Sequence, residues 1–413
     1  MVRRNLEFSC AIVVIGLLAG LAGLATTMLL HFVQHLTYHY SFGTLLAGVS
    51  GSSPIRRAVG PMIGGALAGF GWWRLRSRTV VPPLTETIAQ HQRIPWLAWS
   101  IDAPLQVLLV GSGASLGREG APRQFAVVLG DLGIGWLKRL SPKDREILLA
   151  CAAGAGLGAV YAVPLAGALF TMRIMLKSWH PRALGAALIT SSLAVAVGSA
   201  TTHDHPILDW PSADRSTVLT VHALALTPII LVVGLGFNRL MAAARRTKLL
   251  RSWRLIPAIA AAGLLTGVCS HWWPELPGNG RSVLAVSLNS EMTLSSAAVI
   301  LLLKPALTAA FLRAGAAGGM LTPALAAGAA AGSLFVLTAN TVLGGHMHLP
   351  ALSLAAAVGV LAITQRSPVW AAIFVWELAR PPSWLFLVFL VTAGVSHGLR
   401  VLTERRAAAA PDR

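Results

Sequence analysis

The sequence predicts an all-α polytopic membrane protein, and three observations support that prediction. Of the 413 residues, 55% are hydrophobic and 12% are charged, whereas about 25% of the residues in a soluble domain are charged. The mean hydropathy is +0.68. The stretch from Phe8 to Leu30 has 23 residues and no charge, which is long enough to cross a bilayer about 30 Å thick. Because a cleaved signal peptide would have a shorter apolar region, we expect this stretch to be retained as the first helix.

Apolar segments follow one another along the chain, and Gly or Pro interrupts many of them. They cover residues 8–30, 59–73, 95–113, 122–137, 147–176, 183–201, 217–240, 255–273, 294–312, 319–343, 350–364, 367–379 and 383–402. Helices that break at membrane depth are tolerated only where protein or water surrounds the freed backbone groups. The interruptions therefore indicate the interior of a transporter or channel.

Basic residues between the apolar segments produce the formal net charge of +18. They include Arg74, Arg76 and Arg78, Lys138, Arg139, Lys143 and Arg145, and Arg405 and Arg406. Short basic loops of this kind stay on the cytoplasmic side of a membrane. The distribution predicts that both termini are cytoplasmic and that the basic loops contact lipid headgroups, with no role for nucleic acid.

The three cysteines, Cys10, Cys151 and Cys269, are isolated in or near apolar segments. Neither a disulfide framework nor a zinc-binding spacing is visible among them. We therefore expect neither a metal nor another cofactor.

The chain divides into two similar halves on either side of the polar segment 202–216. The frame Gly117 to Pro122 recurs 201 positions later as Gly318 to Pro323, and Pro164 recurs 204 positions later as Pro368. Paired interrupted segments in two halves indicate a substrate site at the interface of two repeats. We expect a single transmembrane domain, 1–413, with repeat one at about 8–201 and repeat two at about 217–402. The basic tail after residue 402 leads us to expect no cytoplasmic regulatory domain.

The two glycine-rich frames predict helix starts, because Pro122 and Pro323 each suit the first turn of a helix. The first backbone N–H groups of a helix have no partner within it, and the helix dipole adds positive charge at that end. Two such starts that converge would form a dehydrated site for an anion. Partial charges would bind the anion weakly, as conduction requires.

Glu119 lies inside the first frame and is the only carboxylate between Asp102 and Asp131. A charge at membrane depth costs roughly 2.5–3.5 kcal/mol on insertion scales. A carboxylate is itself an anion, so it can occupy the helix-start site until protonation releases it. We interpret Glu119 as a gate or as the carrier of a coupled proton. For Arg118 we favour a structural hydrogen bond or ion pair over direct anion binding.

The two glycine-rich frames resemble sequence motifs of a known family. The stretch from Gly117 to Pro122 resembles the Gly-Arg-Glu-Gly-x-Pro signature of the CLC chloride channels and chloride/proton antiporters. Gly319 to Pro323 is similar to the family's Gly-x-Phe-x-Pro element, with Leu321 where Phe is usual. The stretches Tyr161 to Phe170 and 277–280 also resemble family elements. The similarity runs from about residue 10 to 400 and looks closest to the bacterial ClcB-like branch.

The resemblance implies a CLC-type fold of two inverted-topology repeats with tilted and re-entrant helices, in a homodimer whose subunits each have a pore. It implies a multi-pass protein of the bacterial inner membrane that transports chloride without a cofactor. Glu119 corresponds to the external gating glutamate. The anion would be bound mainly by backbone amides, which the resemblance places at Gly117, Arg118, Gly120, Gly319, Met320, Leu321 and Thr322.

Three departures from the family pattern limit this comparison. The family's Gly-Ser-Gly-x-Pro element is replaced by residues 79–83, which contain no serine, and Ser112 lies on the wrong element to substitute for it. The pore tyrosine near the carboxyl end is missing. The inner proton glutamate of the antiporters corresponds to Ile174, which cannot accept a proton. These departures slightly favour a passive channel, and a chloride/proton antiporter stays open as the alternative.

Other charged residues in apolar segments receive structural interpretations. Glu377 is expected to be a polar cap or a member of an ion pair rather than a proton site. Lys304 and Arg313 are expected to snorkel toward the interface or to face a cavity.

Two further functions differ in class from anion transport. A cation-coupled carrier of organic solutes would need intramembrane carboxylates, and only Glu119, Asp102, Asp131 and Glu377 are candidates. A membrane enzyme is disfavoured because no paired catalytic carboxylates, nucleophile elbow or metal-spaced histidines lie in the apolar segments. The sequence therefore predicts transport of chloride or a similar small anion through a voltage- or pH-gated pore.

Overall fold

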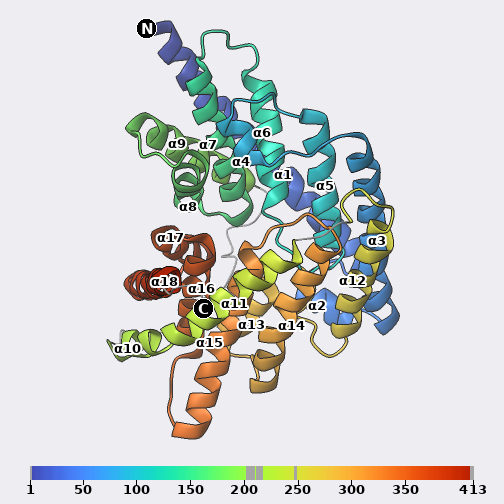
Figure 1. Ribbon diagram of the computed structural model, residues 1–413, viewed down its shortest axis with the longest axis vertical. Helices are drawn as coiled ribbons and strands as arrows, with labels where there is room; N and C mark the ends of the chain where they lie inside the picture. The colour runs from blue at the N-terminus through green and yellow to red at the C-terminus, as the bar shows by residue number, and fades with distance from the viewer. Residues whose placement is uncertain (1, 201–209, 211–216, 246–248, 410–413) are drawn as a thin grey trace.

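The structure, a computed structural model, describes residues 2–200, 210, 217–245 and 249–409 (Figure 1). Within these residues the regular elements are helices, and one isolated β-bridge joins Gly117 to Gly319. The first half contains α1 (Val2–Tyr38), α2 (Leu45–Gly51), α3 (Pro54–Arg78), α4 (Leu84–Ala89), α5 (Trp96–Gly111), α6 (Gly120–Ile134), α7 (Pro142–Tyr161), α8 (Pro164–Phe170), the π-helical turn η1 (Thr171–Leu176) and α9 (Pro181–Gly198). The second half contains α10 (Thr217–Ala225), α11 (Thr227–Ala244), α12 (Leu255–Cys269), α13 (Arg281–Leu288), α14 (Leu294–Arg313), α15 (Leu321–Leu343), α16 (Leu349–Gln365), α17 (Pro368–Ala379) and α18 (Leu385–Ala409). The predicted all-α fold is confirmed.

Six of the described helices are long and apolar enough to cross a membrane: α1, α9, α11, α14, α15 and α18. The first of them has 37 residues, about 55 Å at the helical rise of 1.5 Å per residue. It extends well beyond the predicted 23 residues because polar residues at both ends continue the helix. Since about 30 Å of hydrocarbon must be crossed, α1 is tilted or projects from the bilayer.

The predicted segment 147–176 is three elements rather than one. Ala162 adopts the left-handed conformation (φ 55°) at the end of α7, and Pro164 opens α8. The segment 217–240 likewise divides at Leu226, just before Pro228 near the start of α11. The helices α2, α4 and α13 have only six to eight residues and lie outside the predicted apolar segments because they are too short to form one. The polar segment 202–216, apart from Trp210, lies outside the described residues.

Small residues let the central helices approach closely. On α3 a Cβ added to Gly65 would lie 2.7 Å from the carbonyl oxygen of Ile259, and on α12 a Cβ added to Gly263 would lie 2.2 Å from that of Pro61. A Cβ on Gly332 of α15 would lie 2.8 Å from the Leu352 carbonyl oxygen on α16. Lipid is as apolar as these helices, so close backbone packing holds them together.

Two pairs of prolines occupy corresponding positions in the two halves. Figure 1 shows most helices of the first half in the upper part of the view and most helices of the second half in the lower part. Pro122 and Pro323 each occupy the third position of their helix, α6 and α15, and Pro164 and Pro368 each open a helix, α8 and α17. These matches support the division into two repeats, which stays a proposal.

Candidate functional site

The two glycine-rich loops meet at the junction of the halves. The N–H of Gly117 donates to the carbonyl oxygen of Gly319 at 2.8 Å, and the N–H of Gly319 donates to that of Gly117 at 2.7 Å. Glu119 is the N-cap residue of α6 and Met320 is that of α15. The structure thus brings together the two helix starts that the repeated frame predicted.

The side chain of Glu119 is fully buried and lies at the start of the helix from the other half. Its Oε1 accepts hydrogen bonds from the Thr322 backbone N–H at 3.0 Å, the Thr322 hydroxyl at 2.8 Å and the Tyr161 hydroxyl at 3.2 Å. Its Oε2 has no hydrogen-bond partner among the described residues. The carboxylate therefore lies where the free amides and dipole of α15 attract an anion.

Glycine at two positions leaves room for this carboxylate. A Cβ on Gly117 would lie 2.0 Å from Oε2 of Glu119, and a Cβ on Gly319 would lie 1.4 Å from it. Any other residue at either position would overlap the carboxylate. Glycine at these two positions is therefore what allows the Glu119 carboxylate to lie between the loops.

The predicted backbone amides are not equally available. Those of Gly117 and Gly319 donate to each other's loop, so in this structure neither is free to bind an anion. The amide of Thr322 donates to Glu119. Gly120 and Leu321 are the first residues of α6 and α15, where N–H groups lack partners within the helix. The candidate amides that remain lie at the two helix starts.

Arg118 forms the predicted structural contact. Its Nη2 donates to the carbonyl oxygen of Val160 at 3.2 Å, and its guanidinium lies 5.4 Å from the centre of the Tyr161 ring. The residue is 7% exposed, yet its Nε and Nη1 have no hydrogen-bond partner among the described residues. The structural role thus uses only one of the three guanidinium nitrogens.

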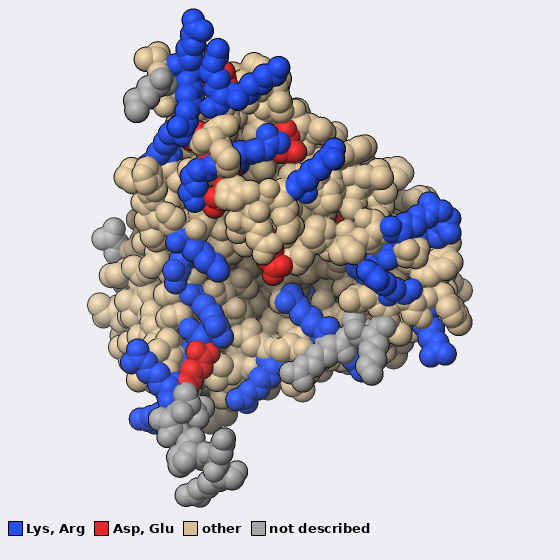
Figure 2. All heavy atoms as spheres, turned by 45° about the horizontal axis from the view of Figure 1, so that its top comes forward, with Lys and Arg blue, Asp and Glu red and all other residues tan. Residues whose placement is uncertain are grey.

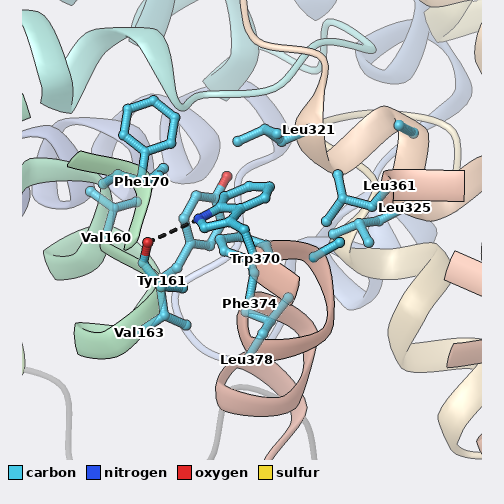
Figure 3. Close-up of a cluster of buried hydrophobic side chains, with 14 of the residues drawn as sticks. Val160, Tyr161, Val163, Phe170, Leu321, Leu325, Leu361, Trp370, Phe374 and Leu378 are labelled. Carbon is cyan, nitrogen blue, oxygen red and sulfur yellow. Dashed lines mark hydrogen bonds between the residues drawn. The ribbon is translucent and has the colours of Figure 1, made fainter. Parts of the chain in front are cut away.

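Two residues of this site were missed in the sequence. Tyr161 ends α7 and supplies a donor to Glu119, and Figure 3 shows it beside Phe374 and Trp370 from the other half. Arg123 donates from Nε to the backbone carbonyl oxygen of Glu119 at 2.7 Å and lies over the Phe170 ring. Arg123 follows Pro122 directly, which was a usable signal. Nothing in the spacing indicates that residue 161 reaches residue 119.

Asp102 forms a buried network beside the first turn of α6. Its carboxylate accepts from Trp72 Nε1 at 2.8 Å, from Gln106 at 2.7 Å and from Gln124 at 3.0 Å. A Cβ on Gly120 would lie 2.2 Å from the Gln106 side-chain oxygen. Both carboxylate oxygens are occupied by donors from the described chain, so Asp102 joins α3, α5 and α6 and positions the start of α6.

The remaining sequence candidates have structural surroundings. The Glu377 carboxylate accepts from the backbone N–H groups of Leu165 at 2.9 Å and Ala166 at 2.7 Å, so it is the predicted polar cap, at the start of α8. Ile174 lies in η1, which continues α8. Ser112 donates to the Leu108 carbonyl oxygen at 2.7 Å within α5, which satisfies its hydroxyl away from the two loops.

The expectation that Lys304 snorkels is wrong. Its side chain is fully buried, and Nζ donates to the carbonyl oxygens of Leu276 at 2.6 Å and Gly278 at 2.7 Å. These carbonyls belong to the segment before α13, so two backbone acceptors satisfy the ammonium group inside the protein. Arg313 is exposed at the end of α14.

Comparison with known proteins identifies the family of this chain. The family model described as "Voltage gated chloride channel" matches residues 64–399. The protein called voltage-gated ClC-type chloride channel ClcB is 28% identical over 380 residues, which cover 88% of this chain and 89% of the relative, in Escherichia coli O81 (strain ED1a) and, with the same figures, in Escherichia coli (strain K12 / DH10B).

Solved structures show the same fold. A slow cyanobacterial Cl⁻/H⁺ antiporter matches with a TM-score of 0.79 at 20% identity, covering 98% of both chains. A CLC-type fluoride/proton antiporter matches with a TM-score of 0.74 at 18% identity, covering 95% of both chains. The family model spans most of the chain and includes both glycine-rich loops, so this chain is a member of the voltage-gated chloride channel (CLC) family.

Proposed function

We propose that the chain transports chloride or a similar small anion through a pore in which Glu119 is the gate. One observation supports this most directly. A buried carboxylate of one half is hydrogen-bonded to the first-turn amide of α15 in the other half. This is the arrangement expected when a tethered anion occupies a site built for a free one.

Protonation of Glu119 would open the gate. The neutral acid loses its attraction to the positive end of α15 and can no longer accept as strongly from Thr322 and Tyr161. The side chain then leaves, and an anion takes its place at the same donors. No Lys or Arg of the described chain forms an ion pair with this carboxylate, so the anion would be held by partial charges, which permit rapid release.

Between channel and antiporter, we favour a passive channel. Residue 174 is an isoleucine in η1, and an apolar side chain cannot pass a proton toward Glu119. The alternative is a chloride/proton antiporter, because two of the similar structures are named as antiporters. In that alternative a proton would reach Glu119 through water.

The test is the reversal potential of purified protein in lipid vesicles under opposed chloride and pH gradients. A channel reverses at the chloride equilibrium potential regardless of pH, and no proton movement accompanies chloride. Proton uptake in a fixed ratio to chloride efflux would reject the channel in favour of the antiporter. Absence of any anion flux would reject the proposed function itself.

We further propose a homodimer with both termini in the cytoplasm. Figure 1 places α8, α9, α17 and α18 along one side of the chain, where Leu165, Ile189, Val369 and Leu387 are exposed apolar residues. The amino-terminal end of α1 pairs with the first turn of α7 through Arg4–Asp144 and with the loop before α7 through Glu7–Arg139. Figure 2 shows many Lys and Arg side chains on this face and few Asp and Glu, which supports the cytoplasmic assignment. The mass of the purified protein by light scattering tests the dimer.

A further inference from the structure

A small cavity adjoins the seated carboxylate of Glu119. Its walls include Arg118, Tyr161, Thr322, Asn279 and Arg281, and its volume is about 10 Å³, which is room for about one water-sized particle. Tyr161 and Thr322 both line this cavity and donate to Glu119. The cavity and the carboxylate therefore share donors.

Arg118 provides the main evidence that an anion binds in the cavity. The residue is 7% exposed, and its Nε and Nη1 have no hydrogen-bond partner in the described chain. A buried charged donor that is left without an acceptor destabilises the protein, and such groups in native proteins usually have an ion or water as partner. An anion in the cavity would accept from the two free nitrogens, which a guanidinium presents in a fixed fork.

Arg281 also lines the cavity, and contacts of its backbone and of the preceding residues fix its position. It is the first residue of α13, and its backbone N–H donates to the Asn279 side-chain oxygen at 3.3 Å. A Cβ on Gly280 would lie 3.1 Å from the Thr322 carbonyl oxygen, so the start of α13 packs directly against α15. Lys304 fixes the preceding segment through Leu276 and Gly278. Two arginines, Arg118 and Arg281, thus line the cavity, and no Asp or Glu is among its lining residues in the described part of the chain.

The cavity lies at the end of the molecule away from Arg4. The charges of Arg118 and Arg281 act on His31, which lies near the carboxyl end of α1, whereas Arg4 is in its first turn. With the amino terminus in the cytoplasm, as proposed above, the cavity is in the outer half of the protein. An anion that arrives from outside can therefore reach Arg118 and Arg281, which line the cavity beside Glu119.

We propose that this cavity is a loading site for one small inorganic anion, held by Nε and Nη1 of Arg118 together with Arg281. This inference rests on the proposed function of Glu119. An anion bound here lies beside the Tyr161 and Thr322 hydroxyls, so it competes with the carboxylate for the same donors. The small volume excludes organic acids and phosphate esters. The full charges of the two arginines raise the local concentration of the anion. The weaker partial charges at the helix starts then bind the anion and release it.

The test compares chloride uptake by oriented membrane vesicles that contain the full chain. In right-side-out vesicles, Arg281→Gln should raise the half-saturating chloride concentration about fivefold, since one of two nearby charges is lost. In inside-out vesicles the same variant should change it by less than about twofold. Arg281→Lys should return it to near the wild-type value because the charge is restored.

Arg56→Gln is the matched control. Arg56 is exposed in the first turn of α3, which follows the outer end of α1, so this variant removes one positive charge on the same side of the membrane but away from the cavity. Its half-saturating concentration should equal that of the wild type. If Arg56→Gln and Arg281→Gln shift it equally, the effect is one of general surface charge and the loading site is rejected.

A second measurement does not depend on a variant. Crystals of the wild-type protein grown in bromide should show an anomalous peak within contact distance of Arg118 Nε and Nη1. A peak that is absent there but present at the α15 start would overturn the loading site and leave the proposed function intact. Normal chloride uptake by Arg281→Gln at every concentration would do the same, whereas wild-type protein without any chloride uptake would reject the proposed function first.

Discussion

The Glu119 carboxylate lies against the α-carbon of Gly319, across the junction of the two halves. It can occupy this position because residue 319 has no side chain. A Cβ on Gly319 would lie 1.4 Å from Oε2 of Glu119 and 3.3 Å from the Glu119 backbone nitrogen. The first distance is far below any non-bonded contact, whereas the second is only tight. A side chain at 319 would therefore collide with the carboxylate much more than with the backbone that carries it.

Gly319→Ala should consequently displace the Glu119 side chain and leave the loop in place. We expect chloride flux in vesicles to rise at neutral pH and to lose most of its dependence on pH, because the gate can no longer occupy its site. Gly236→Ala is the control, since a Cβ at Gly236 on α11 would meet nothing within 4 Å. Flux through Gly319→Ala that equals the wild type at every pH would show that the carboxylate does not block the path.

Glu119→Gln should mimic the protonated gate. The amide has the shape of the neutral acid and cannot ionise, so anion flux should increase and its pH profile should flatten. The measurement is chloride efflux from vesicles across a series of pH values. A variant that carries anions with an unchanged pH profile would show that another group is responsible for the pH dependence.

Tyr161→Phe should shift the pH profile without removing it. The substitution deletes the hydroxyl that donates to Oε1 and keeps the ring against Phe374 and Arg118. A hydrogen bond to a charged group is worth about 1.5–3 kcal/mol, and one pH unit corresponds to about 1.4 kcal/mol. The charged carboxylate is therefore less stable at this position, and the half-maximal activation should move about one to two units toward higher pH.

The control for this shift is Tyr40→Phe. The Tyr40 hydroxyl lies 3.5 Å from the Gln34 side chain and not beside Glu119, so its loss should leave the profile in place. Identical profiles for Tyr161→Phe and the wild type would mean that the hydroxyl does not stabilise the seated gate.

Glu377→Gln should reduce stability and leave transport unaltered. The carboxylate accepts from two backbone N–H groups at the start of α8, and an amide can accept only through its single oxygen. We expect a loss of about 1–2 kcal/mol in the free energy of unfolding, measured by thermal unfolding in detergent. Glu404→Gln, whose side chain is 47% exposed, should cost less than about 1 kcal/mol. A change in proton flux for Glu377→Gln would instead indicate a proton site.

Asp144 should make the protein sensitive to strong acid. Burial raises the pKa of Asp144, but the hydrogen bonds from Arg4 and Ser141 outweigh it, and the pKa is about 2. Because this value is below the ordinary pKa of about 3.9, the interaction stabilises the folded state above that pH and is lost as the pH falls toward 2. Asp144→Asn should unfold at a lower temperature at neutral pH and lose less stability on acidification. A wild-type slope in the variant would refute this assignment.

The helix starts at 120 and 321 could be predicted from sequence because the signal is local. A glycine-rich loop followed by proline at the third helical position reports on its own backbone, whatever surrounds it. The internal repeat then predicted the second helix start, since it aligned Gly117 with Gly318 at a fixed offset along the chain. The same local reasoning placed Glu377 at a helix end, although it could not identify α8 as the helix that the carboxylate caps.

Tyr161, Arg281 and the burial of Lys304 could not be predicted in this way because they depend on contacts between distant segments. Tyr161 and Glu119 are 42 positions apart, and no periodicity relates a residue at the end of one helix to the start of another. Lys304 lies in an apolar helix, where a lysine near an end usually reaches for water. Only the fold shows that the carbonyls of Leu276 and Gly278 replace that water.

The paired hydrogen bonds between Gly117 and Gly319 have a consequence for the speed of the gating proposed for Glu119. They join the two halves through backbone alone, and the bonds from Thr322 and Tyr161 to Glu119 are the ones that break when the gate opens. The seam between the halves can therefore stay closed while one side chain rotates. Side-chain rotation is faster than collective movement of whole domains, which takes microseconds to milliseconds, so opening should be faster than a movement of the two halves relative to each other.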